Sequence, residues 1–310
     1  MVFVGPMQFL RRLTASANQR RGTTARIGGA LARLMLALPF LPLLAGAAHA
    51  QAPKPWEINL QPAFSPVAEG IHSLHNLVLV IITVITIFVG ILLVIVMLKF
   101  NHRANPTPSQ TSHHTGLEIA WTILPALILV VIAIPSFRLV YFQDRTHDAD
   151  MTLKVIAHQW NWEYNYPDHG GLNFISSVLP DDEAKKNGKL RLLDVDNELV
   201  LPVGKNVRIL TSSTEVIHSF FIPSLGVQRY AIPGRTIETW VKINAPGMYY
   251  GQCNQICGKD HSRMPIAIRA VTPAEFDAWL ADAKKKFASS DPADRQAVAR
   301  QLAALDQIQR

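Results

Sequence analysis

Apolar residues gather in three runs along this chain, at residues 34–44, 77–98 and 119–137. The second and third runs are long enough to cross the hydrocarbon core of a bilayer as helices, and the first is short for that purpose. After residue 150 the pattern changes to short Val-, Ile-, Thr- and aromatic-rich stretches separated by Gly, Pro and Asn. This texture is typical of strands and turns in an all-β sandwich or barrel.

The first apolar run predicts a targeting segment. An Arg-rich stretch precedes it, and Ala48-His49-Ala50 follows it as a small-x-small cleavage signal. We therefore expect residues 1–50 to be a signal peptide and the mature chain to start at Gln51, outside the cytoplasm. A retained first membrane helix is the alternative.

The other two apolar runs predict a transmembrane hairpin within residues 51–149. Thr83, Thr86 and Gly90 interrupt the run at 77–98, and Pro125 and Pro135 lie in the run at 119–137, where neighbouring helices can satisfy the freed carbonyls. Basic residues lie in the short connection between the runs, which the positive-inside rule places in the cytoplasm. Both ends of the hairpin are then expected outside.

The β region is expected to form a domain over residues 150–272. Its clearest predicted strand covers residues 151–166, whose even positions would share one face; these positions hold Ile156, His158, Trp160, Trp162, Tyr164 and Tyr166. Thr272-Pro273-Ala274-Glu275 then resembles a capped helix start, so residues 273–310 are expected to form a helical surface tail.

Charge excludes one class of partner. The formal net charge is +7, but six Arg and no acid lie within residues 1–50, which leaves +1 for the remainder. A basic surface for nucleic acid is therefore not supported. Two cysteines, Cys253 and Cys257, are also too few for a disulfide framework.

Candidate metal ligands cluster in one segment, Cys253-x3-Cys257-x3-His261-x2-Met264, and His218 lies upstream of it. Thiolate, thioether and imidazole ligands favour copper, and a His/Cys/Met set is typical of electron-transfer copper sites in β domains. A second thiolate in the loop is compatible with two coppers bridged by both sulfurs. A simple disulfide, or a zinc site completed by the two histidines, remains open on these residues alone.

At this point the sequence closely resembles cytochrome c oxidase subunit II from Trp56 to about Val271. The segments that carry the resemblance are Gln61-Pro62-Ala63, residues 118–125, His158-Gln159-Trp160, residues 216–219 and 223–226, Ala231-Ile232-Pro233-Gly234-Arg235, and the cysteine loop.

The resemblance implies a helical hairpin and a cupredoxin-like Greek-key domain that carries the dinuclear copper centre CuA. It implies Cys253 and Cys257 as bridging thiolates, with His218 and His261 as terminal ligands. Met264 and the backbone carbonyl of Gln255 would be weak ligands. Trp160 matches the aromatic through which the family takes electrons from cytochrome c. The alternative interpretation is that Trp160 only packs within a strand. Glu118 matches the acid at the mouth of a proton channel, although an ordinary acid at a helix end would look the same.

The sequence departs from the family pattern at three positions. Gln255 replaces a Glu that ligates magnesium at the interface with subunit I, and Tyr230 replaces a frequent Asp nearby. Because an amide is a weaker ligand for a hard dication than a carboxylate, these changes argue against magnesium. Asn161 stands where Tyr is common, which should alter local packing more than electron entry.

Docking of a basic cytochrome c would require segregated acids, because residues 150–271 hold 13 basic and 12 acidic side chains. The candidate docking acids are Asp181, Asp182, Glu183, Asp194, Asp196 and Glu215.

The resemblance further implies a multi-pass protein of the bacterial inner membrane with its copper domain in the periplasm. Expected partners are the haem-bearing subunit I, subunit III and cytochrome c. The chain has no C-x-x-C-H haem attachment motif, so no haem is expected in it. Two other functions remain: a copper-free structural subunit of a quinol-oxidase-like complex, and a periplasmic thiol-exchange or copper-delivery protein.

Overall fold

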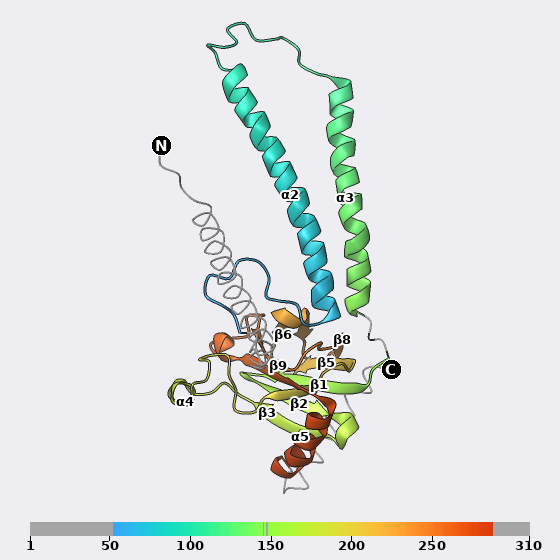
Figure 1. Ribbon diagram of the computed structural model, residues 1–310, viewed down its shortest axis with the longest axis vertical. Coiled ribbons are helices and arrows are strands. Elements are labelled where there is room, and N and C mark those ends of the chain that lie inside the picture. Colours follow the sequence, from blue (N-terminus) through green and yellow to red (C-terminus); the bar gives the residue numbers. More distant parts are fainter. Residues whose placement is uncertain (1–51, 145, 147, 288–310) are drawn as a thin grey trace, which may run out of the picture. The chain divides into compact units, whose positions relative to one another are not determined.

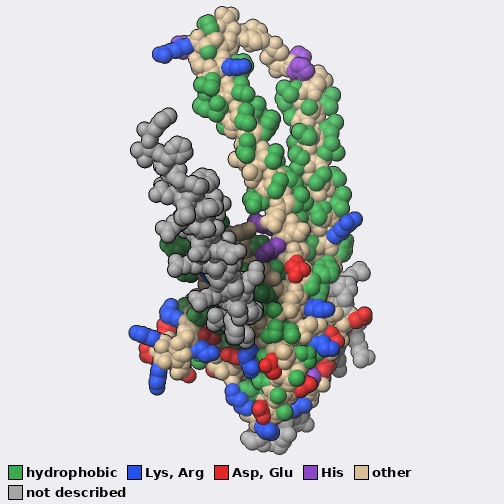
Figure 2. All heavy atoms as spheres, in the orientation of Figure 1, with side chains coloured by type: hydrophobic (Ala, Val, Ile, Leu, Met, Phe, Trp, Pro, Cys, Tyr) green, Lys and Arg blue, Asp and Glu red, His purple; other side chains and the backbone are tan. Residues whose placement is uncertain are grey.

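A computed structural model describes residues 52–144, 146 and 148–287 (Figure 1). The predicted signal peptide and the end of the predicted tail, residues 288–310, lie outside the described residues. Two long helices come first, α2 (Pro66–Lys99) and α3 (Thr115–Asp144). Both are long and apolar enough to cross a membrane, and they contain the two predicted apolar runs. Apolar side chains cover their sides (Figure 2).

The start of α2 is joined to the β domain by a short hydrogen-bonded contact. Ser65 caps the helix by accepting a hydrogen bond from the backbone N–H of Ala68 at 3.0 Å, and its hydroxyl donates to the carbonyl of Leu225 at 2.6 Å. Gly226 (φ +63°) lies against this turn, where an added Cβ would come within 2.9 Å of Ala68 N. The capping residue therefore also serves as a link between helix and domain.

Two five-stranded sheets form the β domain, which confirms the predicted all-β sandwich. One sheet has the order β3-β2-β1-β5-β8 and the other β4-β10-β9-β6-β7. The strands are β1 (Met151–His158), β2 (Asn161–Tyr166), β3 (Leu172–Ser176), β4 (Leu199–Pro202), β5 (Val207–Ser213), β6 (His218–Ile222), β7 (Val227–Ala231), β8 (Ile237–Val241), β9 (Gly247–Cys253) and β10 (Pro265–Val271). Short helical turns connect them: η2 (Pro167–His169), α4 (Asp181–Lys186), η3 (Pro223–Leu225) and η4 (His261–Arg263).

The prediction of one strand over residues 151–166 is wrong. The chain reverses at Gln159 and Trp160, so that β1 and β2 form an antiparallel hairpin in which Val155 pairs with Tyr164 and Ala157 pairs with Trp162. Residues opposite one another in an antiparallel pair share a face. The core therefore takes odd positions from β1 and even positions from β2, rather than even positions throughout.

The predicted capping box at the end of the domain is confirmed. Thr272 caps α5 (Pro273–Lys286), and the side chain of Glu275 accepts a hydrogen bond from the backbone N–H of Thr272. Phe276, Leu280 and Ala283 are buried in the main core, so one face of this surface helix belongs to the domain.

Candidate metal centre

Neighbouring strands bring together ligands that are far apart in the sequence. His218 is the first residue of β6, and Cys253 is the last residue of β9. These strands are antiparallel neighbours, with Phe220 opposite Cys253. His218 is fully buried, and its ring packs edge-on against Trp162 with centroids 6.1 Å apart. The fold therefore fixes the imidazole against the core before any metal binds.

The remaining predicted ligands follow on the loop between β9 and β10. The sulfur of Cys253 lies 3.8 Å from that of Cys257, and both thiols are free. The carbonyl oxygen of Gln255 is 3.3 Å from Cys253 Sγ. Met264 is almost fully buried, and its carbonyl accepts a 3.0 Å hydrogen bond from Cys253 N. Cys257, the carbonyl of Gln255 and the backbone of Met264 therefore all lie against Cys253.

The candidate ligand atoms do not all surround one point. His218 Nδ1 is 3.8 Å from Cys253 Sγ, the two sulfurs are 3.8 Å apart, and His261 Nδ1 is 3.5 Å from Cys257 Sγ. Among the described residues, the group whose ligand atoms all lie within 4.8 Å of one another consists of His218, Cys253 and Cys257. His261 extends this group at the Cys257 end. Each cysteine thus has a histidine of its own.

Burial keeps the titratable groups of the site uncharged when no metal is bound. Burial lowers the pKa of His218 to about 4, against the opposing attraction of Glu215, so its imidazole is neutral and offers a lone pair at physiological pH. Burial, followed by the proximity of Cys253, raises the pKa of the Cys257 thiol. Two thiolates at this separation repel unless a positive charge lies between them. The donor set therefore fits a soft metal ion, which ionises coordinating thiols.

Trp160 lies in the tight turn between β1 and β2 and touches the cysteine loop. Its indole Nε1–H donates to the carbonyl of Cys257 at 3.2 Å, and the side-chain amide of Gln159 donates to the same carbonyl at 3.0 Å. Trp160 is half-buried, as expected of a residue at the surface of a domain. Trp160 is thus joined to a predicted ligand by one hydrogen bond.

Two residues that shape this contact, Gly258 and Lys259, were not predicted from the sequence. Gly258 (φ +123°) lies so close to the indole that an added Cβ would come within 2.9 Å of Trp160 Cζ2. Lys259 follows it, with Nζ 5.4 Å from the Trp160 ring centroid. A glycine directly after the second cysteine is a signal for such a close approach.

The candidate docking acids do not form one free patch. Asp194 is buried and accepts a hydrogen bond from the Tyr250 hydroxyl, and Asp196 accepts from the backbone N–H of Ser177. Asp181 lies between Arg191 (2.8 Å) and Arg263 (3.5 Å). Glu215 accepts a hydrogen bond from Gln159 N at 3.2 Å, so four of the six acids are engaged within the domain.

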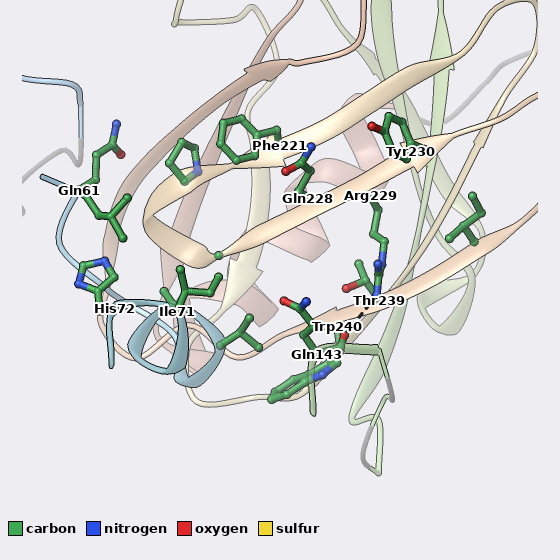
Figure 3. Close-up of a pocket in the computed structure, with 16 residues that line it drawn as sticks. Gln61, Ile71, His72, Gln143, Phe221, Gln228, Arg229, Tyr230, Thr239 and Trp240 are labelled. Atoms are coloured by element: carbon green, nitrogen blue, oxygen red, sulfur yellow. Dashed lines mark hydrogen bonds between the residues drawn. The ribbon is translucent and has the colours of Figure 1, made fainter. Parts of the chain in front are cut away.

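Glu118 lies in the first turn of α3, where its carboxylate accepts a 3.2 Å hydrogen bond from the backbone N–H of His114. Tyr230 lies on β7, opposite Ser219 on β6. It lines a cavity of about 440 Å³ between α2, the end of α3 and strands β6 to β8, beside Arg229 and Gln228 (Figure 3). Arg229 pairs with Asp144 at this cavity and so joins α3 to the domain.

Comparison with known proteins assigns both halves of the chain. The family model described as cytochrome c oxidase subunit II, periplasmic domain, matches residues 151–271. The model described as cytochrome c oxidase subunit II, transmembrane domain, matches residues 53–139. The protein is therefore anchored in a membrane by its helices and carries a separate C-terminal domain.

Individual relatives agree with the family models. The probable cytochrome c oxidase subunit 2 of Rickettsia bellii is 45% identical over 251 residues, which cover 81% of this chain and 93% of the relative. Cytochrome c oxidase subunit 2 of Oenothera berteroana is 42% identical over 237 residues, or 74% of this chain and 92% of the relative. The crystal structure of the periplasmic domain of subunit II of cytochrome oxidase from Bradyrhizobium japonicum is 48% identical, with a TM-score of 0.43, and the match covers 46% of this chain and 99% of that domain. A single chain that matches both family models in this order belongs to the cytochrome c oxidase subunit II family.

Proposed function

We propose that this protein is the electron-entry subunit of its haem–copper oxidase. In this proposal it accepts electrons from cytochrome c at a dinuclear copper centre. The electrons then pass to haem in subunit I, where oxygen is reduced to water and protons are translocated. The observation that carries the proposal is the pairing of His218 with Cys253 and of His261 with Cys257, with the two sulfurs 3.8 Å apart.

This arrangement suits two metal ions better than one, because His261 lies against Cys257 but outside the compact group of His218, Cys253 and Cys257. A single tetrahedral zinc ion needs four ligands at about 2.0–2.3 Å, all facing one point. Here each histidine approaches a different sulfur, so Cys253 and Cys257 would hold a pair of ions together, with His218 and His261 as the remaining main ligands. Met264 and the carbonyl of Gln255 are available as weak additional ligands. When bound, such a copper pair supplies a centre that exchanges one electron.

The chain's contribution is to hold these ligands still. Cys253 N donates to Met264 O at 3.0 Å, Asn254 N donates to Ser219 O at 3.3 Å, and Arg263 N donates to Asp260 O at 2.8 Å. These bonds tie the loop to itself and to β6. A loop held in this way would keep the candidate ligands in place when the charge of a bound centre changes, so that little reorganisation would oppose electron transfer.

Trp160 is proposed as the point of electron entry. Its indole N–H is bonded to the carbonyl of Cys257, which gives a short route from the domain surface to a bridging sulfur. The half-buried ring leaves an edge for a donor to contact.

We also propose the arrangement of the chain in the membrane and a role for Glu118. Residues 1–50 would be removed as a signal peptide, the domain over residues 150–272 would lie in the periplasm, and the connection between α2 and α3 would face the cytoplasm of a bacterial inner membrane. Glu118 would then lie at the cytoplasmic mouth of a proton channel into subunit I. We propose no magnesium ligand at Gln255 or Tyr230.

The test uses the full chain, purified in detergent, reduced, supplied with copper and reoxidised. We expect two copper ions per chain and an electron paramagnetic resonance spectrum in which one unpaired electron is shared equally by both. A single-copper spectrum would contradict the dinuclear centre. Persistent failure to bind copper after full reduction of Cys253 and Cys257 would favour the copper-free structural subunit or the thiol-exchange protein instead.

A further inference from the structure

The segment that leads into α2 exposes three large apolar side chains close together. Trp56 is 97% exposed, Ile58 92% and Leu60 41%, and they alternate along an irregular loop of residues 53–63. A single exposed apolar residue is ordinary on a protein surface, because polar groups are too few to cover that surface. Three within five positions form a patch, which is typical of a surface that contacts another molecule or a membrane.

Both ends of this loop are fixed to the β domain. Ala52, just before it, packs against the apolar cluster that contains Tyr250. Just after it, Phe64 N donates to the carbonyl of Ser224 at 2.9 Å, and Asn244 N donates to the carbonyl of Phe64 at 2.9 Å. Among the described residues, the two apolar clusters of the domain include none of the loop's three exposed side chains. The middle of the loop is therefore held in place without being drawn into a core.

The end of the loop lies beside the second turn of α2, which sets its height relative to a membrane. Leu60 and Gln61 line the same cavity as His72 of α2. Figure 3 shows Gln61 and His72 at the same end of this cavity. The apolar run of α2 starts at Leu77, which is about 7.5 Å beyond His72 along the helix axis. The polar layer on each side of the hydrocarbon core is about 5–8 Å thick. The end of the loop is therefore at the level of this layer.

The composition of the loop fits the interfacial layer of a bilayer. Tryptophan is enriched in that layer, because its ring is apolar and its N–H is polar. The charged residues of the loop are Lys54 and Glu57, which have opposite signs. Glu57 N donates to the carbonyl of Lys54 at 3.2 Å, and the Glu57 carboxylate accepts from Lys54 N at 3.4 Å. Because the two charges cancel, apolar contact rather than attraction to anionic headgroups would hold the loop at a lipid surface.

We propose that Trp56, Ile58 and Leu60 form an interfacial anchor, which inserts among the phospholipid headgroups of the leaflet next to the β domain. The partner is the lipid surface itself rather than a protein subunit. This inference concerns how the domain is attached to the membrane, and it does not depend on the copper centre. α2 already connects the domain to this leaflet, and the anchor adds a second contact beside it. Two contacts restrict tilting of the domain about the start of α2.

The test uses the full chain in nanodiscs of brominated phosphatidylcholine, because bromine quenches tryptophan fluorescence on contact. Bromine is placed either near the headgroups or near the ends of the acyl chains. The chain holds six tryptophans, so the Trp56 signal is taken as the difference between the unaltered chain and Trp56→Phe. We expect bromine near the headgroups to quench this signal about twofold more than bromine near the chain ends, as for a side chain at the interface. Trp279→Phe is the control, because Trp279 packs against Tyr166 of the β domain and its difference signal should resist both lipids.

A second pair of variants tests the apolar patch while Trp56 is kept. Ile58→Gln removes an apolar neighbour, and we expect it to reduce the headgroup quenching of the Trp56 signal, measured as the same difference in that background. Ile175→Gln is the matched control, because Ile175 is 51% exposed but lies on β3, outside the loop. It should leave the Trp56 signal unchanged.

Three results would overturn the interfacial anchor. The first is a Trp56 signal that bromine near the headgroups quenches no more than bromine near the chain ends, or no more than it quenches the Trp279 signal. The second is an equal effect of Ile58→Gln and Ile175→Gln. The third is loss of the headgroup quenching when the Trp56 signal is measured in the assembled oxidase, because a neighbouring subunit would then cover the loop in place of lipid.

Discussion

The helical hairpin and the β domain use the same apolar residue types in opposite ways. Leu93 on α2 is 58% exposed, whereas Leu153 on β1 is fully buried. The apolar windows of both helices are without buried residues, while the domain encloses a continuous core between its two sheets. Charged side chains gather on the domain rather than along the helices (Figure 2).

The difference reflects two solvents. In a bilayer the apolar side chains are surrounded by lipid chains, so a spanning helix does not need to bury them in a protein core. In water the domain must bury its apolar residues, and this burial gives the rigidity that a metal centre requires. The predicted ligands accordingly lie on the part of the chain that holds its own core.

The largest expected effect tests whether the centre depends on the domain alone. Cys253→Ser removes one of two sulfurs, and we expect complete loss of the dinuclear copper spectrum while the chain still inserts into membranes. Copper content and electron paramagnetic resonance measure the loss of the copper centre, and membrane fractionation measures insertion into the membrane. Ser262→Ala, an exposed change on the same loop, is the control and should keep the spectrum. A dinuclear signal from Cys253→Ser would show that the ligand assignment is wrong.

A matched pair of truncations tests the two solvents directly. Leu153→Ala leaves a cavity in the core and should destabilise the domain by about 2–5 kcal/mol. Leu93→Ala removes a lipid-facing group, where lipid fills the space, and should change domain stability by less than about 0.5 kcal/mol. Urea unfolding of the full chain in detergent, followed by tryptophan fluorescence, measures both. Equal losses would mean that Leu93 packs in a core after all.

A smaller effect concerns the contact between the cysteine loop and Trp160. Gly258→Ala imposes strain at φ +123° and a clash with the indole. We therefore expect the free energy of unfolding of the domain to fall by about 1–3 kcal/mol and the tryptophan fluorescence to change. Gly234→Ala is also strained, at φ +72°, but its added Cβ meets no atom within 4 Å. It should leave the copper spectrum unchanged, whereas Gly258→Ala should alter it. Identical copper spectra for Gly258→Ala and Gly234→Ala would show that the contact between Gly258 and Trp160 does not affect the copper centre.

The smallest effect is a pH dependence within the domain. Burial acts to raise the pKa of Glu163, but hydrogen bonds from His158 and Asn173 outweigh it and the net pKa lies below 4.5. The carboxylate therefore stabilises the folded state above about pH 4.5, and this contribution is lost as the pH falls through the lower folded-state pKa. Glu163→Gln should make the acid-side decline in unfolding free energy shallower, by less than about 1 kcal/mol. Parallel stability curves for both proteins between pH 3 and 6 would contradict this role.

Some of the molecule followed from the sequence because the signal was local. The two helices required only runs of apolar residues, and the start of α5 required only Thr272 and Glu275 at capping distance. The cysteine loop identified most ligands, since Cys253, Cys257, His261 and Met264 lie within one short segment. Family resemblance then supplied the carbonyl of Gln255 and the role of Trp160.

Tertiary structure decided what depends on contacts between distant segments. The reversal at Gln159 and Trp160 carries none of the usual turn residues, so the alternating pattern reads as one strand until pairing separates β1 from β2. The acids Asp181, Asp194 and Asp196 look free in the sequence, because their partners lie on other segments. Likewise, only the pairing of β6 with β9 brings His218 to Cys253, and only the fold sets Lys259 over Trp160. Local sequence fixes which residue types are present, and through-space contacts fix which of them meet.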